Sequence, residues 1–298
     1  MRILICLFWI LSLASGYSKG QELEPRLYAA LPKNLNSIVA VYALQHGNII
    51  TDPSLPISNA NITVNNISAA YIRTFSLAGK LARIQVTVPF TKIAGKIQID
   101  GRDTTGARTG FGDTRIRFSV NLFGAPAYDR KQFVSYTQKT IFGVGLVTSV
   151  PTGLYLPSKR INIGSNRWAF KPEIGVSKRF GRFYGEAYSG VWFYTNNNEF
   201  LVSKILEQEP VFSLQGHLAY YFKNRMWVSV NGTWFKGGET RVDEAGMDDL
   251  MDNWRFGGTW STPLGKGHSI KVQYHFGAFT TTNYHFNVLV IGYQFVFY

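Results

Sequence analysis

Charged and histidine residues recur at every second position in several stretches of the chain. Within the range 167–180, Lys171 and Glu173 share one set of alternating positions, and Ile174 and Val176 share the other. Successive side chains of a β-strand point to opposite faces, so this period of two predicts a strand with one apolar and one charged face. Charged residues in that arrangement offer electrostatic chemistry, because cations attract anions and carboxylates between them form ion pairs.

The candidates for lining an internal passage are the charged and histidine residues on the polar faces of such strands. Cations outnumber carboxylates among them, and rings of Arg and Lys favour anions in pores. The set therefore predicts a passage with a weak preference for anions. The alternative is that Glu173 and Glu186 pair with neighbouring cations and brace the interior without conducting. The candidates are Arg83, Arg115, Arg117, Arg167, Lys171, Glu173, Glu186, His217, Arg255, Lys271 and His275.

Catalytic, metal-binding and cofactor-binding patterns are absent from the sequence. No histidine belongs to a recognisable Ser/His/acid set, and His268 and Ser269, as neighbours on a strand, point to opposite faces. There is no Gly-rich phosphate loop and no Cys/His cluster with metal-ligand spacing. The acidic loop 243–252 lacks the spacing of a calcium loop, so we expect a solvated loop rather than a cation site that bridges lipopolysaccharide. We expect no metal, no cofactor and no enzyme activity, against the alternative of a hydrolase in a barrel wall.

The first residues have the layout of a secretory signal peptide. Arg2 precedes an uncharged apolar run over 3–14, which is too short to span a bilayer as a helix, and small residues follow the run. Cleavage can fall after Gly16 or after Gly20. With the second site, residues 1–20 are removed and one unit over 21–298 is left. The single cysteine, Cys6, lies in the removed part, so the mature chain has no disulfide. The formal net charge of +13 favours anionic lipids or solutes, and export makes nucleic acid the least favoured partner.

The elements that would carry these residues are about twelve long strands. Most have about ten or more residues, the length that a tilted transmembrane β-strand requires. The links between them alternate between short turns that contain Gly, Asn and Lys and longer polar connections. This alternation is typical of barrels in the bacterial outer membrane, whose short turns lie in the periplasm. The predicted strands lie near 37–47, 62–75, 81–91, 113–123, 139–151, 167–180, 182–195, 210–223, 226–236, 253–264, 268–279 and 285–298.

These features predict an all-β fold, a transmembrane up-and-down antiparallel β-barrel of the outer-membrane type. A secreted β-sandwich is the alternative, but its strands are usually about half as long, and a closed barrel leaves no exposed strand edge.

Two local features depart from a regular barrel. Pro172 removes one ladder hydrogen bond, which predicts a bulge, and the link 124–138 is long for a periplasmic turn. Aromatic residues are expected to form the interfacial girdle, with the lining of a route for aromatic solutes as the alternative. They are Trp168, Tyr184, Tyr194, Trp227, Trp234, Trp254 and Trp260.

The last predicted strand carries aromatic residues on one face. Ile291, Tyr293, Phe295 and Phe297 share one parity, in a pattern that resembles the assembly signal of outer-membrane barrels, although Tyr298 follows its last aromatic residue. We therefore expect location in the outer membrane of a Gram-negative cell. The expected partners are the barrel-assembly machinery, outer-membrane lipid with lipopolysaccharide, and small solutes.

Four stretches of the sequence indicate a known protein family, in addition to any alternation of polar and apolar residues. They are P-T-G-L-Y-L-P-S-K-R-I-N-I-G-S-N-R-W-A-F-K-P-E-I-G-V-S over 151–177, G-F-G-D-T-R-I-R-F-S-V-N-L-F-G-A-P over 110–126, D-P-S-L-P-I over 52–57 and S-L-Q-G-H over 213–217. Together they resemble the outer-membrane transporters grouped under the label "MetA-pathway of phenol degradation". The resemblance spans most of 21–298 and implies a barrel of about twelve strands, similar to that of functional-amyloid exporter porins. It also implies hydrophobic or aromatic compounds as solutes.

The sequence thus predicts a porin-like barrel that passes small solutes by diffusion. The second hypothesis is a non-conducting barrel that acts as a surface receptor, adhesin or structural anchor through its long extracellular loops. Blocking of the interior by the loop 92–112 or by the N-terminal residues 21–36 would favour this second hypothesis. The sequence leaves the two open.

Overall fold

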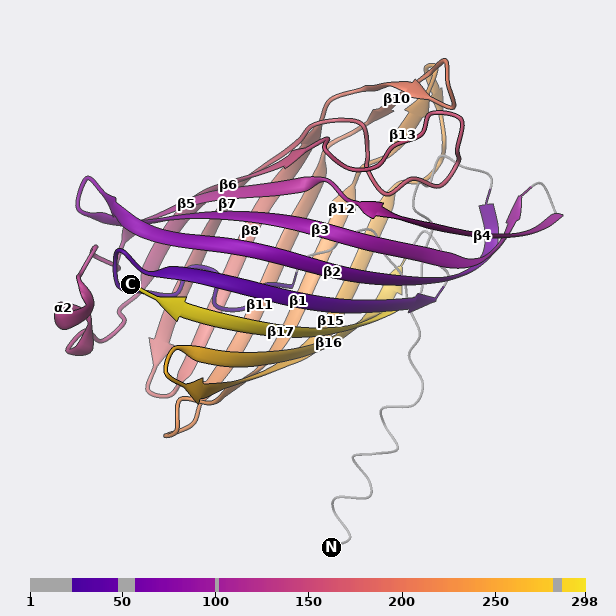
Figure 1. The fold of residues 1–298 in the computed structure, drawn as a ribbon. Coiled ribbons are helices and arrows are strands. Elements are labelled where there is room, and N and C mark those ends of the chain that lie inside the picture. The colour runs from indigo at the N-terminus through magenta and orange to yellow at the C-terminus, as the bar shows by residue number, and fades with distance from the viewer. Residues whose placement is uncertain (1–22, 48–56, 100–101, 281–285) are drawn as a thin grey trace, which may run out of the picture.

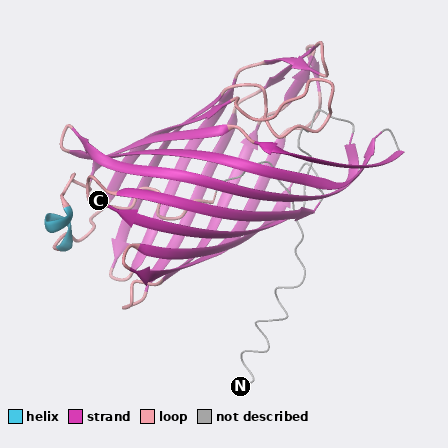
Figure 2. Cartoon of the chain, viewed as in Figure 1, coloured by secondary structure: helices cyan, strands magenta, loops and turns pink. Residues whose placement is uncertain are grey.

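Twelve long antiparallel strands form a closed β-barrel (Figures 1 and 2). The ring closes because β2 pairs with both β1 and β3. The structure is a computed structural model that describes residues 23–47, 57–99, 102–280 and 286–298, so the expected signal peptide lies outside the described residues. The predicted fold class and strand number are confirmed. Around the ring the strands are β1 (Asn36–Gly47), β2 (Ile57–Leu77), β3 (Lys80–Ile99), β5 (Thr114–Phe123), β6 (Ile141–Val150), β7 (Ala169–Phe180), β8 (Phe183–Tyr194), β11 (Val211–Tyr221), β12 (Trp227–Gly237), β15 (Met251–Gly265), β16 (His268–Thr280) and β17 (Phe286–Phe297).

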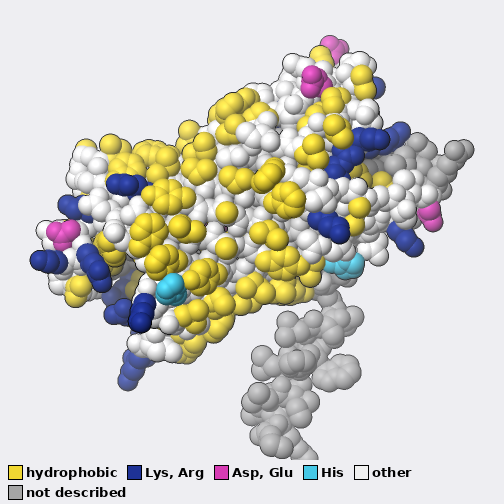
Figure 3. Space-filling model, viewed as in Figure 1, with side chains coloured by type: hydrophobic (Ala, Val, Ile, Leu, Met, Phe, Trp, Pro, Cys, Tyr) yellow, Lys and Arg dark blue, Asp and Glu magenta, His cyan; other side chains and the backbone are white. Residues whose placement is uncertain are grey.

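The alternation of apolar and polar residues assigns the two faces of each strand. On β7, Lys171 and Glu173 turn inward and are 2% and 5% exposed, whereas Ile174 faces outward and is 52% exposed. On the side seen in Figure 3, the apolar outer faces form a yellow band across the middle of the molecule, as expected for a surface in contact with lipid. The predicted bulge at Pro172 is wrong. β7 and β8 keep one register on both sides of Pro172, and only the pairs at Lys171 and Pro172 are missing.

The short connections lie at one end of the barrel, together with helix α2 (Arg130–Val134) and the end of β17 (Figure 1). This end is called the periplasmic end below, because short turns lie in the periplasm in outer-membrane barrels. The long link between β5 and β6 contains α2, whose cap Asp129 accepts hydrogen bonds from the backbone N–H groups of Lys131 and Gln132. Within the described ranges, no helix has the length and apolar character needed to cross a membrane.

At the opposite, outer end the wall is longer than predicted. The prediction of a loop over 92–112 is wrong, because β3 continues through this segment and pairs with β4 (Arg102–Phe111). The inward side chains Ile93 and Ile97 are buried on this extension. Gly95 lies between them, so the apolar period is interrupted and the sequence does not mark a strand. The segment therefore extends the wall and does not block the interior.

The long loops after β8 and β12 form a second, four-stranded sheet at the outer end. Asp249 accepts hydrogen bonds from the Thr240 backbone N–H and hydroxyl at 2.7 and 2.8 Å, and Asp243 accepts one from the Ile205 N–H at 2.9 Å. Carboxylates of the acidic loop 243–252 thus hold the sheet together. In the part of the chain that the structure describes, no His, Cys, Asp or Glu cluster could hold a metal ion. The strands are β9 (Asn197–Phe200), β10 (Lys204–Gln208), β13 (Thr240–Val242) and β14 (Ala245–Gly246).

Candidate channel interior

The residues before β1 lie inside the barrel. This stretch, residues 23–35, is called the N-terminal segment below. At its start the Leu23 carbonyl accepts a hydrogen bond from Gln273 of β16 at 2.8 Å. At its end the Lys33 N–H donates to the Tyr128 carbonyl at 2.8 Å, in the link that carries α2. The segment therefore runs from the interior to the periplasmic end before the chain enters the wall.

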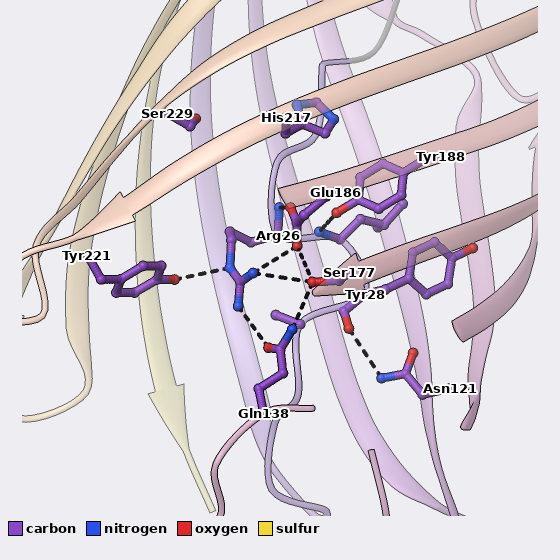
Figure 4. Close-up of polar contacts among 12 residues, drawn as sticks. Arg26, Tyr28, Asn121, Gln138, Ser177, Glu186, Tyr188, His217, Tyr221 and Ser229 are labelled. Atoms are coloured by element: carbon purple, nitrogen blue, oxygen red, sulfur yellow. Dashed lines mark hydrogen bonds and ion pairs between the residues drawn. The ribbon is translucent and has the colours of Figure 1, made fainter. Parts of the chain in front are cut away.

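Arg26 is the main polar anchor of the N-terminal segment (Figure 4). Its guanidinium forms an ion pair with Glu186 at 2.8 Å and donates to the Tyr221 hydroxyl and the Gln138 side-chain oxygen, each at 3.2 Å. Its backbone N–H donates to the second oxygen of Glu186 at 2.6 Å. Ser177 completes the group by donating to Glu186 at 2.8 Å and accepting from Gln138 at 2.8 Å. One residue of the segment is thus tied to β7, β8, β11 and the periplasmic link.

Tyr28 occupies a slot made by two glycines that face each other on neighbouring strands. Gly143 of β6 pairs with Gly175 of β7, and a Cβ atom on either would collide with the Tyr28 ring. Tyr188 packs edge-on against this ring, with centroids 5.4 Å apart, and the Tyr28 hydroxyl donates to Glu173 at 3.3 Å. The missing side chains of two glycines therefore provide the space that the segment fills.

The charged candidates of β3, β5 and β7 contact the N-terminal segment or one another. Arg83 donates to the Leu27 carbonyl at 2.5 Å, and Arg117 forms an ion pair with Glu24. Glu173 lies 3.1 Å from the Lys171 ammonium and 3.3 Å from the Arg117 guanidinium. The interior cations on this side are therefore neutralised in part by carboxylates and by backbone carbonyls of the segment.

The remaining candidates for lining the passage also lie on the inner face. They are either nearer the outer end or on strands other than those just described. His217 Nδ1 lies 2.9 Å from the Asn231 side-chain oxygen. Arg255 lies 3.0 Å from His275 Nδ1, and Arg167 donates to Gln208 of β10 at 2.5 Å. The half-buried candidates Arg115 and Lys271 share the inward parity of their strands. The structure places all predicted candidates on the inner face in two regions, one beside the N-terminal segment and one beyond it, and their role in conduction stays a prediction.

The sequence did not predict that one inner wall is apolar. On β1, Ile38 and Tyr42 face outward and are exposed, which turns Val39 and Val41 inward. Val41 pairs with Gly292 of β17, so the inward residues of β17 include Val290. The signal that would have shown this wall is the nearly continuous apolar run in both strands, since strands that are apolar on both faces lose their alternation.

The apolar wall continues into a cluster at the outer end. Ile62 and Val64 of β2 pack there with Phe286 and Val288 of β17. The same cluster includes Phe200 of β9, so the outer sheet is in contact with the wall, and also Leu206, Ile93 and Ile97. The interior thus has an apolar side along β17 and β1, which continues at the outer end to Ile62 and Val64 of β2, and a polar side along β7 to β16.

Four of the seven residues predicted for the aromatic girdle face outward. Trp168 and Trp254 are exposed on the outer face, and Trp234 and Trp260 share the outward parity of their strands. The other three face inward: Tyr184 lies beneath the Arg26 guanidinium at 4.1 Å and Tyr194 beneath Arg167 at 4.9 Å. Trp227 shares the inward parity of β12 and stacks on Tyr221.

Comparison with known proteins assigns the family. Residues 49–293 match the family described as "Putative MetA-pathway of phenol degradation", and the chain belongs to this family. The COG4313 outer membrane channel from Pseudomonas putida F1 has a similar structure, with a TM-score of 0.78, 19% identity and coverage of 93% of this chain and 100% of that chain. The β domain of the Bordetella autotransporter BrkA follows with a TM-score of 0.52, 13% identity and coverage of 89% and 100%. No curated protein matches the sequence. The chain therefore belongs to this family and has the fold of outer-membrane β-barrels.

Proposed function

We propose that this member of the phenol-degradation family is a passive passage for small hydrophobic or aromatic solutes, with a basic interior that favours anions. The observation that carries the proposal is the apolar inner wall along β17 and β1. A water-filled barrel has a polar interior on all sides. An apolar solute gains no stabilising apolar contact in such an interior. An apolar wall stabilises such a solute by about 25 cal/mol for each Å² of apolar surface that leaves water.

The opposite wall supplies the complementary chemistry. Polar side chains such as Gln215, Asn231 and Thr233 line β11 and β12, and they can hydrogen-bond a hydroxyl or carboxylate while a ring lies on the valines. The family description names a phenol, a ring with one hydroxyl group. A solute of this class matches the two-sided interior, which supports the proposal.

The position of the N-terminal segment is compatible with passage along the apolar wall. Leu27 and Tyr28 pack against Ile141 of β6 and Tyr188 of β8. In the order of strands around the ring, β8 lies directly across from β1, because five strands separate them on either side. The valines of β1 are only half buried. A path between the segment and this wall would let a solute pass without displacing the segment entirely.

The test compares a ring-bearing anion with a simple one. In a planar bilayer, the reversal potential with benzoate on one side and chloride on the other gives the ratio of their permeabilities. The variant Val41→Thr/Val290→Thr keeps volume but makes the wall polar, and we expect the benzoate ratio to fall about twofold to tenfold because apolar contact is lost. Val176→Thr/Val230→Thr makes the same change at two exposed positions of the outer face, so it is the matched control and should not lower the ratio. An unchanged ratio in the valine variant would contradict the proposal.

The second candidate function is a non-conducting barrel that acts through its outer loops. It is favoured by the anchoring of Arg26 in the interior and by the contact of the outer sheet with the wall cluster. A folded, reconstituted protein that gives no current steps in either salt would support this candidate and exclude diffusion through the barrel.

A further inference from the structure

The periplasmic end of the barrel has a strongly one-sided charge. The five connections there, with the strand residues next to them, are called the periplasmic rim below and cover 77–81, 123–141, 178–183, 221–227 and 264–268. Ten Lys and Arg residues lie on this rim and all are exposed, whereas Asp129 is its one acidic residue. Figure 3 shows dark blue groups gathered at the end that carries α2 and the C-terminus.

The rim cations have no acidic partners in the described part of the chain. No ion pair there includes any of the ten, and the carboxylate of Asp129 is used in capping α2. The outer end differs, because some of its cations are paired. Lys204 lies 3.3 Å from Asp243 and Lys236 lies 3.2 Å from Asp252. The rim therefore presents uncompensated positive charge, whereas the outer end is mixed.

Two rim cations, Lys178 and Lys80, are held at the lipid-facing edge of the barrel rather than over its opening. The Lys178 ammonium lies 5.0 Å from the centre of the Phe180 ring, and Lys80 lies 5.7 Å from that of Phe123. Both rings are more than half exposed on the outer face. Aromatic residues of this kind sit at the boundary between hydrocarbon and headgroups. The cations beside them are therefore at the depth of lipid phosphates, which long basic side chains can reach.

The distribution of the charge identifies the kind of partner. Every one of the five connections carries at least one exposed cation, and the largest groups are Lys178, Arg179 and Arg182 on one turn and Lys223 and Arg225 on the next. A ring of charge around the whole perimeter is complementary to a shell of lipid, whereas a soluble acidic protein would need a patch on one side. We propose that the periplasmic rim binds the phosphate headgroups of anionic phospholipids and gathers them around the barrel in the inner leaflet.

The expected strength follows from membrane electrostatics. A basic residue near an anionic lipid surface is attracted over about one Debye length, which is about 10 Å at 0.1 M salt and about 3 Å at 1 M. In phosphatidylcholine vesicles that contain the refolded full chain, spin-labelled phosphatidylglycerol and spin-labelled phosphatidylcholine report which lipid contacts the barrel. We expect an association constant about threefold or more higher for phosphatidylglycerol at low salt, falling towards equality at 1 M sodium chloride.

Two variants with the same change in net charge locate the effect. The rim variant Lys178→Gln/Arg182→Gln/Lys223→Gln/Arg225→Gln should lose most of the preference for phosphatidylglycerol. The outer-end variant, with Gln at Lys92, Lys96, Arg102 and Lys159, should keep it. A heat-dependent shift in electrophoretic mobility verifies that each barrel is folded.

Three results would overturn the proposal. One is equal association of both lipids with the wild type at low salt, which would also point to an acidic protein as the partner of the rim. Another is a preference that survives 1 M salt, and the third is an equal loss in the two variants. If the rim variant does not fold, Lys178→Gln/Arg225→Gln, which removes half of the same charge, takes its place in the comparison.

Discussion

Arg26 illustrates how one side chain holds an irregular segment inside a regular barrel. Its ion pair with Glu186 is almost completely buried, with the two side chains 11% and 0% exposed. Removing one partner of a buried pair leaves the other charge without compensation, which costs far more than the loss of an exposed pair. The Arg26 side chain also joins Tyr221 and Gln138, which lie on different elements. Replacing Arg26 should therefore loosen the N-terminal segment more than replacing any other residue of the segment.

Replacing Arg26 with Gln should loosen the N-terminal segment. Loss of a charged hydrogen bond in a buried site is worth about 1.5 to 3 kcal/mol, so the fraction of time in an open state should rise about tenfold or more. Single-channel recording of the refolded protein measures this fraction directly. Lys33→Gln is the control, because only the backbone of Lys33 is seen to bond the periplasmic link. Equal open fractions for Arg26→Gln and wild type would show that the segment does not gate the barrel.

The Arg26 site could be predicted only in part. The alternation within β7 and β8 placed Glu173 and Glu186 inside, and bracing by neighbouring cations was one of two alternatives. The pairing of Glu186 with Arg26 of the segment could not be predicted, because the two residues lie 160 positions apart in the chain. The N-terminal segment also has no period that would indicate which of its residues are buried.

At the scale of elements, the N-terminal segment and the wall are matched by shape. Gly143 and Gly175 lie opposite each other on β6 and β7, and Tyr28 fills the space above them. Because a close-packed interior tolerates added atoms poorly, the fit depends on both glycines. The strands themselves do not need glycine there, so a larger residue should affect the segment more than the barrel.

Gly175→Val should expel Tyr28 from its slot while leaving the barrel folded. Valine suits a strand, but its side chain would occupy the volume of the Tyr28 ring. Displacement exposes the peptide bond after Arg26, so trypsin should cleave there in the variant and spare it in the wild type, as read by mass spectrometry. Gly216→Val on β11 has open space around its Cβ atom and is the matched control. Protection of Arg26 in both variants would show that the slot does not hold the segment.

The outer sheet should respond to pH through Asp243. The Ile205 N–H and the Lys204 ammonium hold the pKa of this carboxyl below its usual value, so its ionised form is the one that binds. The contact should be fully present above about pH 3.9, the usual pKa of Asp, and lost as the pH falls through the lowered value. Hydrogen exchange of 204–208, corrected for its intrinsic pH dependence, should be flat from pH 7 to 5 and rise below pH 4. Asp243→Asn should give the faster exchange already at pH 7, with 211–221 as the internal reference.

The elements show why the wall was more predictable than the ends. Long strands with one apolar face, such as β7 and β11, repeat every second residue and can be located to within a few positions. The extension of β3 past residue 91 and the strand β4 were missed, because Gly95 and the Thr-rich range 102–111 break that period. The short strands of the outer sheet are fixed by contacts such as Asp243 with Ile205, which join loops far apart in the sequence.

At the scale of the whole molecule, the balance of charge changes along the barrel axis. The periplasmic rim is basic, the outer end is mixed, and the interior cations meet the carboxylates of Glu173 and Glu186 and the N-terminal segment. Glu24, Arg26 and the carbonyl of Leu27 all belong to that segment. The segment therefore sets both the free width of the interior and part of its electrostatic field. Its removal should change conductance and ion selectivity together.

Deleting residues 23–31 should give larger current steps and a stronger preference for anions than the intact chain shows. The cause is that Arg117 loses Glu24 and Arg83 loses the Leu27 carbonyl, so more of their positive potential acts on passing ions. The step size and the reversal potential under a salt gradient measure the two effects. In the deletion background, Arg115→Gln/Arg117→Gln should reduce the anion preference without reducing the step size. If deletion enlarges the steps and leaves the reversal potential unchanged, the segment blocks the interior only by its volume. If neither changes, ions pass along the apolar wall without encountering the segment or the cations that it covers.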